Sequence, residues 1–253
     1  MANTNSKDPA LADKVAVVVG GGRGIGQATA RKLASAGASV VVASRTSSEL
    51  DEIVADIQAD GGEASAIVAD ASQREDVQAL AEFVREVHGR VDVLVNSAGT
   101  SLIASLEATS EMDWDHVVDT NLKAPFLCTR AMLDLLRASE SGQVISIASK
   151  VGLTGHRYVT AYTAAKAGLI GFSRALSDEL SHEGIRVIVL CPGPVDTPMR
   201  WEATPSMDPG LAIPADTVAE TILFLVGLNS KVTVNELVVE AVAYDDKAVL
   251  IEG

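Results

Sequence analysis

A tyrosine and a lysine four residues apart, Tyr162 and Lys166, are the pair in this sequence best suited to acid–base chemistry. Apolar residues at helical intervals from Ala161 to Leu180 predict a helix, and a spacing of four places both side chains on one face. A free tyrosine titrates near pH ~10, so it needs a neighbour that favours its phenolate before it can work at neutral pH. We expect the Lys166 ammonium to lower the pKa of Tyr162, and Ser149 lies thirteen residues upstream. The alternative is an ordinary core tyrosine beside a solvated lysine.

A glycine-rich turn near the start of the chain is typical of a dinucleotide site. The apolar strand Val15–Val19 runs directly into Gly20-Gly21-Gly22-Arg23-Gly24-Ile25-Gly26, and a helix is expected from about Gln27. Glycines ahead of a helix N-terminus let backbone N–H groups approach a pyrophosphate, and the helix dipole favours the negative charge. Glycine-rich turns are also common between strands and helices that bind nothing, so only the strand-turn-helix context makes this one indicate a dinucleotide site.

Six motifs in order make the chain similar to the short-chain dehydrogenase/reductase family, in its compact branch of 3-oxoacyl-[acyl-carrier-protein] reductases. The resemblance covers roughly Lys14 to Glu240. It rests on the glycine turn, Asn96-Ser97-Ala98-Gly99, Asn121 in a Thr-Asn-Leu setting, Ser149, the Tyr162/Lys166 pair, and Pro192-Gly193-Pro194-Val195-Asp196-Thr197-Pro198-Met199.

The resemblance implies a role for each matching residue. Tyr162 would donate the proton to a carbonyl oxygen, Lys166 would tune it and bind the nicotinamide ribose, Ser149 would hold the substrate oxygen, and Asn121 would hold a water linking Lys166 to solvent. Asp70 would contact the adenine, Asn96 would support the sheet edge, and Thr197 with the Val195 backbone would orient the carboxamide. The full set of expected cofactor residues is Gly20, Arg23, Gly24, Ile25, Gly26, Ser44, Arg45, Asp70, Asn96, Ala98, Gly99, Tyr162, Lys166, Pro192, Gly193, Val195 and Thr197.

The cofactor is expected to be NADP(H) rather than NAD(H). An acidic residue after the second strand binds a free ribose 2′-hydroxyl, whereas a 2′-phosphate needs a cation. Ser44 stands where NAD-preferring relatives carry Asp, while Arg45 and Arg23 offer charge-assisted bonds to phosphate. The alternative for both arginines is an ordinary surface charge.

Composition excludes several other classes of partner. Acidic residues outnumber basic ones by 34 to 20, and the resulting net charge of −14 would repel nucleic acids and anionic lipid surfaces. The two cysteines offer neither metal-ligand spacing nor a disulfide framework, so no metal is expected. With no signal-like or membrane-spanning run, we expect a cytoplasmic protein acting on a small molecule.

Strands and helices alternate along the chain, which predicts an α/β fold: one Rossmann-like, doubly wound parallel sheet of about seven strands with helices on both faces. Residues 1–13 and 241–253 are expected to be tails around a domain of residues 14–240, within which residues 197–214 form a long loop. The expected strands are Val15–Val19, Ser39–Ala43, Ala64–Val68, Val91–Val95, Gln143–Ala148, Arg186–Leu190 and Glu236–Glu240; the helices are Gln27–Ala36, Ser48–Asp60, Ser72–His88, Ser110–Arg137, Thr160–Glu183 and Ala215–Leu228.

Three functions remain open at this point: a carbonyl reductase or alcohol dehydrogenase, a 3-oxoacyl-thioester reductase, and a catalytically idle dinucleotide-binding protein. The substrate walls are expected in residues 100–106, 151–158 and 199–213, with Leu102, Ile103, Leu153, Met199, Trp201 and Met207 as the apolar members and His156 and Arg157 as solvated ones. The family resemblance also implies a homotetramer in which helices Ser110–Arg137 and Thr160–Glu183 pair through outward residues, namely Ala124, Phe126, Ala167 and Phe172.

Overall fold

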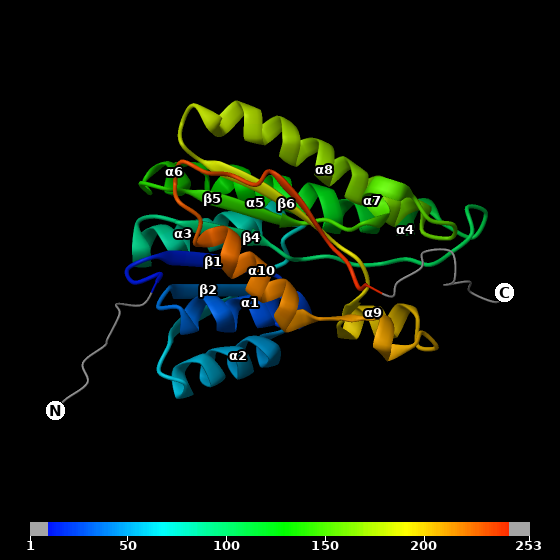
Figure 1. Ribbon diagram of the computed structural model, residues 1–253, viewed down its shortest axis with the longest axis horizontal. Helices are drawn as coiled ribbons and strands as arrows, with labels where there is room; N and C mark the ends of the chain where they lie inside the picture. The colour runs from blue at the N-terminus through cyan, green and yellow to red at the C-terminus, as the bar shows by residue number, and fades with distance from the viewer. Residues whose placement is uncertain (1–9, 243–253) are drawn as a thin grey trace.

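A seven-stranded parallel sheet forms the centre of the molecule, with strand order β3-β2-β1-β4-β5-β6-β9 (Figure 1). The structure is a computed structural model that describes residues 10–242. The strands are β1 Val15–Val19, β2 Ser39–Ser44, β3 Glu63–Val68, β4 Val93–Asn96, β5 Gln143–Ile147, β6 Arg186–Pro192 and β9 Glu236–Val239. The predicted fold class is confirmed.

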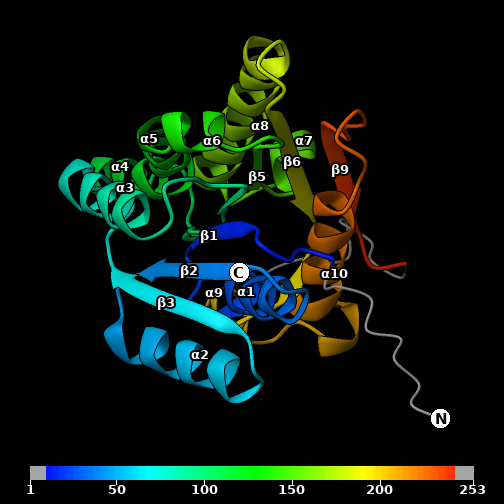
Figure 2. The same cartoon turned by 90° about the vertical axis from the view of Figure 1, so that its left-hand side faces the viewer.

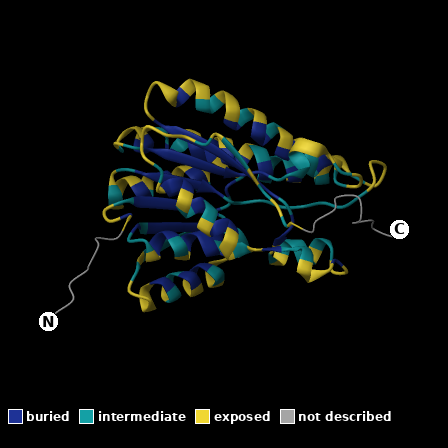
Figure 3. Cartoon of the chain, viewed as in Figure 1, coloured by how far each residue is buried: buried dark blue, intermediate teal, exposed yellow. Residues whose placement is uncertain are grey.

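Helices cover both faces of this sheet, as Figure 2 shows. Because side chains alternate along a strand, Ala16 and Val18 join one apolar cluster and Val17 and Val19 the other. The first cluster includes residues of α1 Gly24–Ser35, α2 Ser47–Ala59 and α10 Ala215–Val226. The second includes residues of α3 Arg74–His88, α5 Ala124–Ala131, α6 Leu133–Arg137 and α8 Thr160–Ser181. The inner strands are consequently buried, whereas edge strands β3 and β9 and the outer helix faces are more exposed (Figure 3).

The expected single helix over residues 110–137 is wrong. The structure has α4 Glu111–Val118, a π-helical turn Asp119–Lys123, and then α5 and α6. Pro125, in the first turn of α5, has no N–H to donate, and in an α-helix its ring would press on the Asn121 carbonyl four residues earlier. A wider π turn accommodates this, and such turns are frequent at functional sites.

The expected loop over residues 197–214 also contains regular structure. It holds α9 Pro198–Ala203, a 3₁₀ turn Pro209–Leu211 and β8 Ile213–Pro214, which pairs in parallel with β7 Val195–Asp196 just before the loop. Thr197 is the N-cap of α9, and its side chain accepts a hydrogen bond from the Arg200 N–H. Pro198, whose missing N–H costs nothing at the first helical position, starts the helix.

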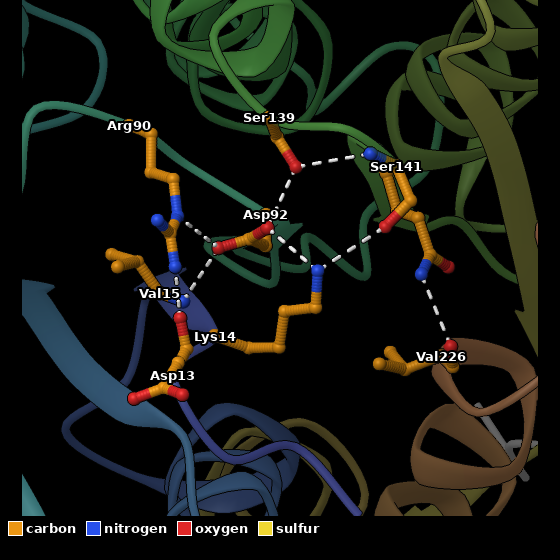
Figure 4. Close-up of polar contacts among 9 residues, drawn as sticks. Asp13, Lys14, Val15, Arg90, Asp92, Ser139, Ser141 and Val226 are labelled. Atoms are coloured by element: carbon orange, nitrogen blue, oxygen red, sulfur yellow. Dashed lines mark hydrogen bonds and ion pairs between the residues drawn. The ribbon is translucent and has the colours of Figure 1, made fainter.

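At the opposite ends of the strands, the buried carboxylate of Asp92 joins several segments (Figure 4). It accepts hydrogen bonds from the Val15 N–H at 2.9 Å and the Ser139 hydroxyl at 2.6 Å. It also forms ion pairs with Lys14 at 3.1 Å and Arg90 at 3.0 Å. Although burial opposes ionisation, these partners hold the pKa of Asp92 below its ordinary value.

The expected tails fall mainly in residues 1–9 and 243–253, which lie outside the described residues. Of the first tail, residues 10–13 are described, and there Leu11 is buried against the core while its N–H donates to the Ala36 carbonyl at 2.8 Å. None of the helices in residues 10–242 has the length and apolar character needed to cross a bilayer.

Candidate functional site

A cleft lies at the carboxyl ends of the strands, where the chain order reverses between β1 and β4. In doubly wound sheets this switch point is where ligands bind. Two adjoining cavities share Ile25, Ser97, Gly99, Thr197 and Met199, and so form one continuous cleft. Figure 1 shows α7 Val151–Thr154 and α9 at this end of the molecule.

The glycine turn leaves no room for side chains. A Cβ on Gly20 would lie 2.5 Å from the Ala98 nitrogen, and Gly20 has a φ of +79°. A Cβ on Gly26 would lie 2.0 Å from the Gly20 carbonyl oxygen. Gly24 also has a positive φ, of +58°, and starts α1 three residues earlier than expected. The turn therefore offers backbone and a helix N-terminus to the cleft, the arrangement that a pyrophosphate requires.

One half of the cleft brings together the residues expected around the adenosine. It is lined by Arg23, Ser44, Arg45 and Asp70. The Asp70 carboxylate accepts two hydrogen bonds from Ser72, at 2.9 Å from its N–H and 2.7 Å from its hydroxyl. Partial burial opposes ionisation of Asp70, but these bonds and the charge of Arg45 hold its pKa below the ordinary value.

Two acidic side chains that were not expected from the sequence lie near this half of the cleft. Arg23 forms an exposed ion pair with Glu202 of α9 at 3.0 Å. Glu49, in the first turn of α2, lines the same cavity as Arg45. Glu49 stands five residues beyond Ser44, so a search for an acid directly at the strand end passes over it.

The floor between the two halves of the cleft is formed by Ala98 and Gly99 and supported from below by Asn96. The buried Asn96 amide donates to the Thr129 hydroxyl at 3.2 Å and to the Ser146 hydroxyl at 3.5 Å, which ties β4 to α5 and β5. Its carbonyl oxygen has no hydrogen-bond partner among the described residues. Ala98 and Gly99 line the cleft itself.

The other half brings Ser149, Tyr162 and Lys166 together with Asn121. Ser149 follows β5, whereas Tyr162 and Lys166 lie on α8. The Lys166 ammonium donates to the Ile147 carbonyl at 2.7 Å and lies 5.6 Å from the centre of the Tyr162 ring. The predicted cluster therefore forms.

The direction of the Tyr162 pKa differs from the expectation. Burial raises the pKa of Tyr162, while its hydrogen bond with Ser149 and the charge of Arg200 act against that rise. Burial also lowers the pKa of Lys166 to about 8. Desolvation is the largest effect on both groups, and the groups that oppose it at Tyr162 are Ser149 and Arg200 rather than Lys166. At neutral pH the Tyr162 phenol is therefore protonated, and Lys166 is mostly protonated as well.

Asn121 lies in the π-helical turn and is fully buried. Its amide donates to the Thr100 and Val117 carbonyls, both at 2.8 Å. A Cβ on Gly99 would lie 3.0 Å from the Asn121 carbonyl oxygen and 3.7 Å from the Lys166 nitrogen, so both groups face the Gly99 backbone.

The last expected motif forms the far wall of the cleft through Pro192, Gly193, Val195 and Thr197. The Pro192 carbonyl accepts from the Lys150 N–H at 2.9 Å, and the Gly193 N–H donates to the Val239 carbonyl at 2.8 Å. Edge strand β9 thus holds this wall in place.

The substrate end of the cleft differs in part from the expected walls. Ile103 and Met199 line it, as do Val151 and Val159, but Leu102, Leu153, Trp201 and Met207 do not. The Trp201 indole instead donates to Asp196 at 2.7 Å. His156, expected to be solvated, lines the cavity together with Arg200, which the sequence analysis did not single out. Among the described residues, no group of three His, Cys, Asp or Glu side chains is placed to hold a metal ion.

Comparison with known proteins assigns this arrangement to a family. The family model described as short chain dehydrogenase matches residues 14–208. The chain belongs to the short-chain dehydrogenase family. Like the family, it is an oxidoreductase that acts on carbonyl and alcohol groups of a small molecule, with a nicotinamide dinucleotide as its cofactor.

Three relatives illustrate the range of short-chain dehydrogenases similar to this chain. A 3-oxoacyl-[acyl-carrier-protein] reductase of Synechocystis sp. is 41% identical over 191 residues, which are 75% of this chain and 77% of that protein. A metagenomic short-chain oxidoreductase solved in complex with NADP has a TM-score of 0.80 at 35% identity, covering 91% of this chain and 97% of that one. An alcohol dehydrogenase of Thermococcus sibiricus, complexed with 5-hydroxy-NADP, has a TM-score of 0.86 at 30% identity, covering 92% and 98%.

Proposed function

We propose that the protein is an NADP(H)-dependent carbonyl reductase or alcohol dehydrogenase with Tyr162 as its general acid and base. The observation that carries this proposal is the convergence of Ser149, Tyr162 and Lys166 in one cavity that adjoins the glycine turn. The residues of the cleft also fit a dinucleotide. Its turn is built from glycines at positions where a Cβ would clash with nearby backbone, so the turn presents bare backbone to a pyrophosphate.

The protein's contribution is a proton and a fixed orientation, while the nicotinamide supplies the hydride. In the reductive direction, Tyr162 donates its phenolic proton to the carbonyl oxygen as the carbonyl carbon gains the hydride, giving a secondary alcohol. Ser149 hydrogen-bonds the same oxygen and holds it beside the phenol. Lys166 would hold the nicotinamide ribose, and Asn121 would hold a water through which the proton is replaced.

The direct test compares the parent protein with Tyr162→Phe, which keeps the ring and removes the proton. We expect turnover of a ketone to fall by about 10²–10⁴-fold, the range typical of a lost general acid, while NADPH binding stays nearly intact. NADPH oxidation and NADPH fluorescence titration give the two readouts. A variant that reduces a good substrate at close to the parent rate would contradict the assignment, and a parent protein that reduces no carbonyl would favour an idle dinucleotide-binding protein.

Preference for NADP(H) over NAD(H) is proposed on the basis of Arg45, with Arg23 beside it. In support, two similar solved structures hold NADP or an NADP derivative. Dissociation constants for NADPH and NADH should be measured for the parent, Arg45→Gln and Glu49→Gln. Removing the Arg45 charge should weaken NADPH binding selectively, by about 10–100-fold for lost charged hydrogen bonds, whereas Glu49→Gln should not weaken it. Equal affinity of the parent for both cofactors would overturn the preference.

A second candidate function is 3-oxoacyl-thioester reduction, favoured by the similarity to the Synechocystis 3-oxoacyl-[acyl-carrier-protein] reductase. It uses the same catalytic residues and differs only in what the substrate carries beyond its ketone. Rates with acetoacetyl-coenzyme A and with free ketones of similar size separate the two candidates, since only a thioester reductase should clearly prefer the former.

A further inference from the structure

The space between the glycine turn and the end of β2 is occupied in part by a carboxylate from α2. Gly22 differs from Gly20 and Gly24, because its φ is not positive. A Cβ on Gly22 would instead lie 2.7 Å from Glu49 Oε2 and 2.9 Å from the Ser44 hydroxyl oxygen. The glycine at this position therefore leaves room for two side-chain oxygens that approach the backbone of the turn.

The same two side chains line the half of the cleft that is proposed to hold the adenosine of the cofactor. In a dinucleotide fold, the ribose lies beside the end of the second strand, and an acidic side chain there accepts a hydrogen bond from its 2′-hydroxyl. The strand end of this chain carries Ser44 and no acid. Glu49 brings a carboxylate to the same place from the first turn of the following helix.

The carboxylate of Glu49 is available to a ligand in this cavity. Glu49 is half-buried, and its side chain has no hydrogen bond or ion pair with any residue in the described part of the chain. Arg45 lines the same cavity, is exposed, and likewise forms no ion pair within residues 10–242. The two opposite charges are therefore not paired with each other, and each can act on the group at the ribose 2′ position.

We propose that Glu49 is a specificity-determining residue for the cofactor, whose carboxylate accepts a hydrogen bond from the free 2′-hydroxyl of NAD(H) and repels the 2′-phosphate of NADP(H). Arg45 acts in the opposite direction, since a guanidinium attracts a phosphate through charge-assisted hydrogen bonds. Glu49 therefore limits the preference for NADP(H) that Arg45 gives. This inference rests on the proposed dinucleotide-dependent function and names a further residue that sets its cofactor specificity.

The experiment measures dissociation constants for NADPH and NADH, which differ only in the 2′-phosphate, by fluorescence titration. Adenosine 2′,5′-bisphosphate and 5′-AMP, titrated by calorimetry, repeat the comparison with the adenosine half alone. The parent is compared with Glu49→Gln, which removes the charge and keeps the shape, and with Glu49→Ala, which also removes the acceptor. Glu52→Gln is the matched control, because Glu52 is an exposed acid on the same helix and does not line the cavity.

We expect the affinity for NADPH relative to NADH to rise by about 10–100-fold in Glu49→Gln, the size of a changed hydrogen bond to a charged group. In this variant the rise should come mainly from tighter NADPH binding, because the repulsion of the phosphate is gone. Glu49→Ala should also weaken NADH binding, because no acceptor remains for the 2′-hydroxyl. Adenosine 2′,5′-bisphosphate relative to 5′-AMP should follow the same order, and Glu52→Gln should leave both ratios as in the parent.

The outcomes separate this inference from the function on which it rests. Unchanged ratios in both Glu49 variants, or equal changes for both cofactors, would overturn the role of Glu49 alone. A rise of the same size in Glu52→Gln would assign the effect to the net charge of the protein and also overturn it. If Arg45→Gln did not weaken NADPH binding while Glu49→Gln strengthened it, the preference for NADP(H) would fail and the role of Glu49 would stand. A parent protein that binds none of the four nucleotides would reject the dinucleotide-dependent function and this inference together.

Discussion

Burial sets the charge of both ionisable groups in the candidate catalytic site. Tyr162 stays a neutral phenol to a higher pH than a free tyrosine, because burial raises its pKa. Lys166 loses its proton more easily than a free lysine, with a pKa of about 8. For the reductive direction the first change is useful, since the acid must hold its proton until the alkoxide forms. The lower pKa of Lys166 means that, as the pH rises, the lysine loses its charge before Tyr162 ionises.

Carbonyl reduction should therefore lose efficiency as the pH rises through the pKa of Lys166, about 8. A lysine is charged below its pKa, so the cation proposed to hold the ribose is present at neutral pH and is lost as the pH rises above about 8. The kcat/KM of the parent, measured from about pH 6 to pH 10, should be level first and then decline. Lys166→Arg provides the control, because a guanidinium stays charged throughout this range and should move the decline upward even if its rate is lower. A parent profile that stays level to the alkaline end would contradict the assignment.

At the scale of elements, the site depends on two segments that approach each other closely. The turn after β1 touches the segment after β4, where a Cβ on Gly20 would meet the Ala98 backbone. The π-helical turn between α4 and α5 places Asn121 against Thr100 of the same segment. The floor of the cleft is thus formed by backbone segments packed so closely that a side chain on Gly20 would not fit between them.

Gly20→Ala should consequently weaken both folding and cofactor binding. Its φ of +79° and the 2.5 Å approach to Ala98 force either strain or movement of the turn. We expect a loss of about 1–3 kcal/mol in the free energy of unfolding, measured by urea titration, together with weaker NADPH binding.

Gly171→Ala makes the same chemical change on α8, where a Cβ would meet nothing within 4 Å. It should stabilise the protein by about 0.5–1 kcal/mol, because alanine is the better helix former. If Gly20→Ala were as well tolerated as Gly171→Ala, the close packing of the turn would be refuted.

For the molecule as a whole, stability at the end of the sheet opposite the cleft depends on Asp92. Asp92→Ala removes the carboxylate that joins β4 to Lys14, Arg90 and Ser139. Lys14 and Arg90 are 34% and 41% exposed, so both can return to water once the carboxylate is gone. We therefore expect a loss of about 2–3 kcal/mol in the free energy of unfolding at neutral pH, near the value of a hydrogen bond to a charged group.

The pH dependence of that loss provides its control. Folding depresses the pKa of Asp92, so the unfolded state binds the proton more readily and the carboxylate stabilises the fold above its unfolded pKa, ~4. This stability is lost as the pH falls through the lower pKa of the folded state. The difference between the parent and Asp92→Ala in urea unfolding should therefore shrink on acidification, and a constant difference would argue against an ionic contribution.

Assembly into a homotetramer is proposed from the family resemblance, with α5 and α8 at one two-fold interface. The rings of Phe126 and Phe172 meet edge to face at 6.3 Å on these helices, and Phe126 is 40% exposed. Ala124, expected to face outward with them, is buried instead, whereas Ala167 is exposed. The mass of one chain is 26.3 kDa, and light scattering at micromolar concentration should give four times this value. A monomeric mass would reject the proposal.

The sequence by itself determined the fold class and the residues gathered in the cleft. Alternating strand and helix periods are local properties, and parallel strands necessarily bring their carboxyl ends to one edge, so motifs placed at those ends had to meet. The helix break at Asn121 was missed because the apolar pattern continues across Pro125, and only the π turn lets the chain continue past the missing N–H. The helix α9 was not expected because prolines in this segment are typical of a loop, whereas Pro198 is in fact the first residue of the helix.

Only the tertiary structure decided the electrostatics of the site. Whether Lys166 lowers the pKa of Tyr162 depends on how far both are removed from water, and that is set by packing between α8 and the strands rather than by their spacing of four. The pairing of Arg23 with Glu202 joins residues 179 positions apart, which no local pattern can indicate. The charge of Arg200 acts on Tyr162 because α9 lies against the same cavity, and charge acts through distance in space and not along the chain.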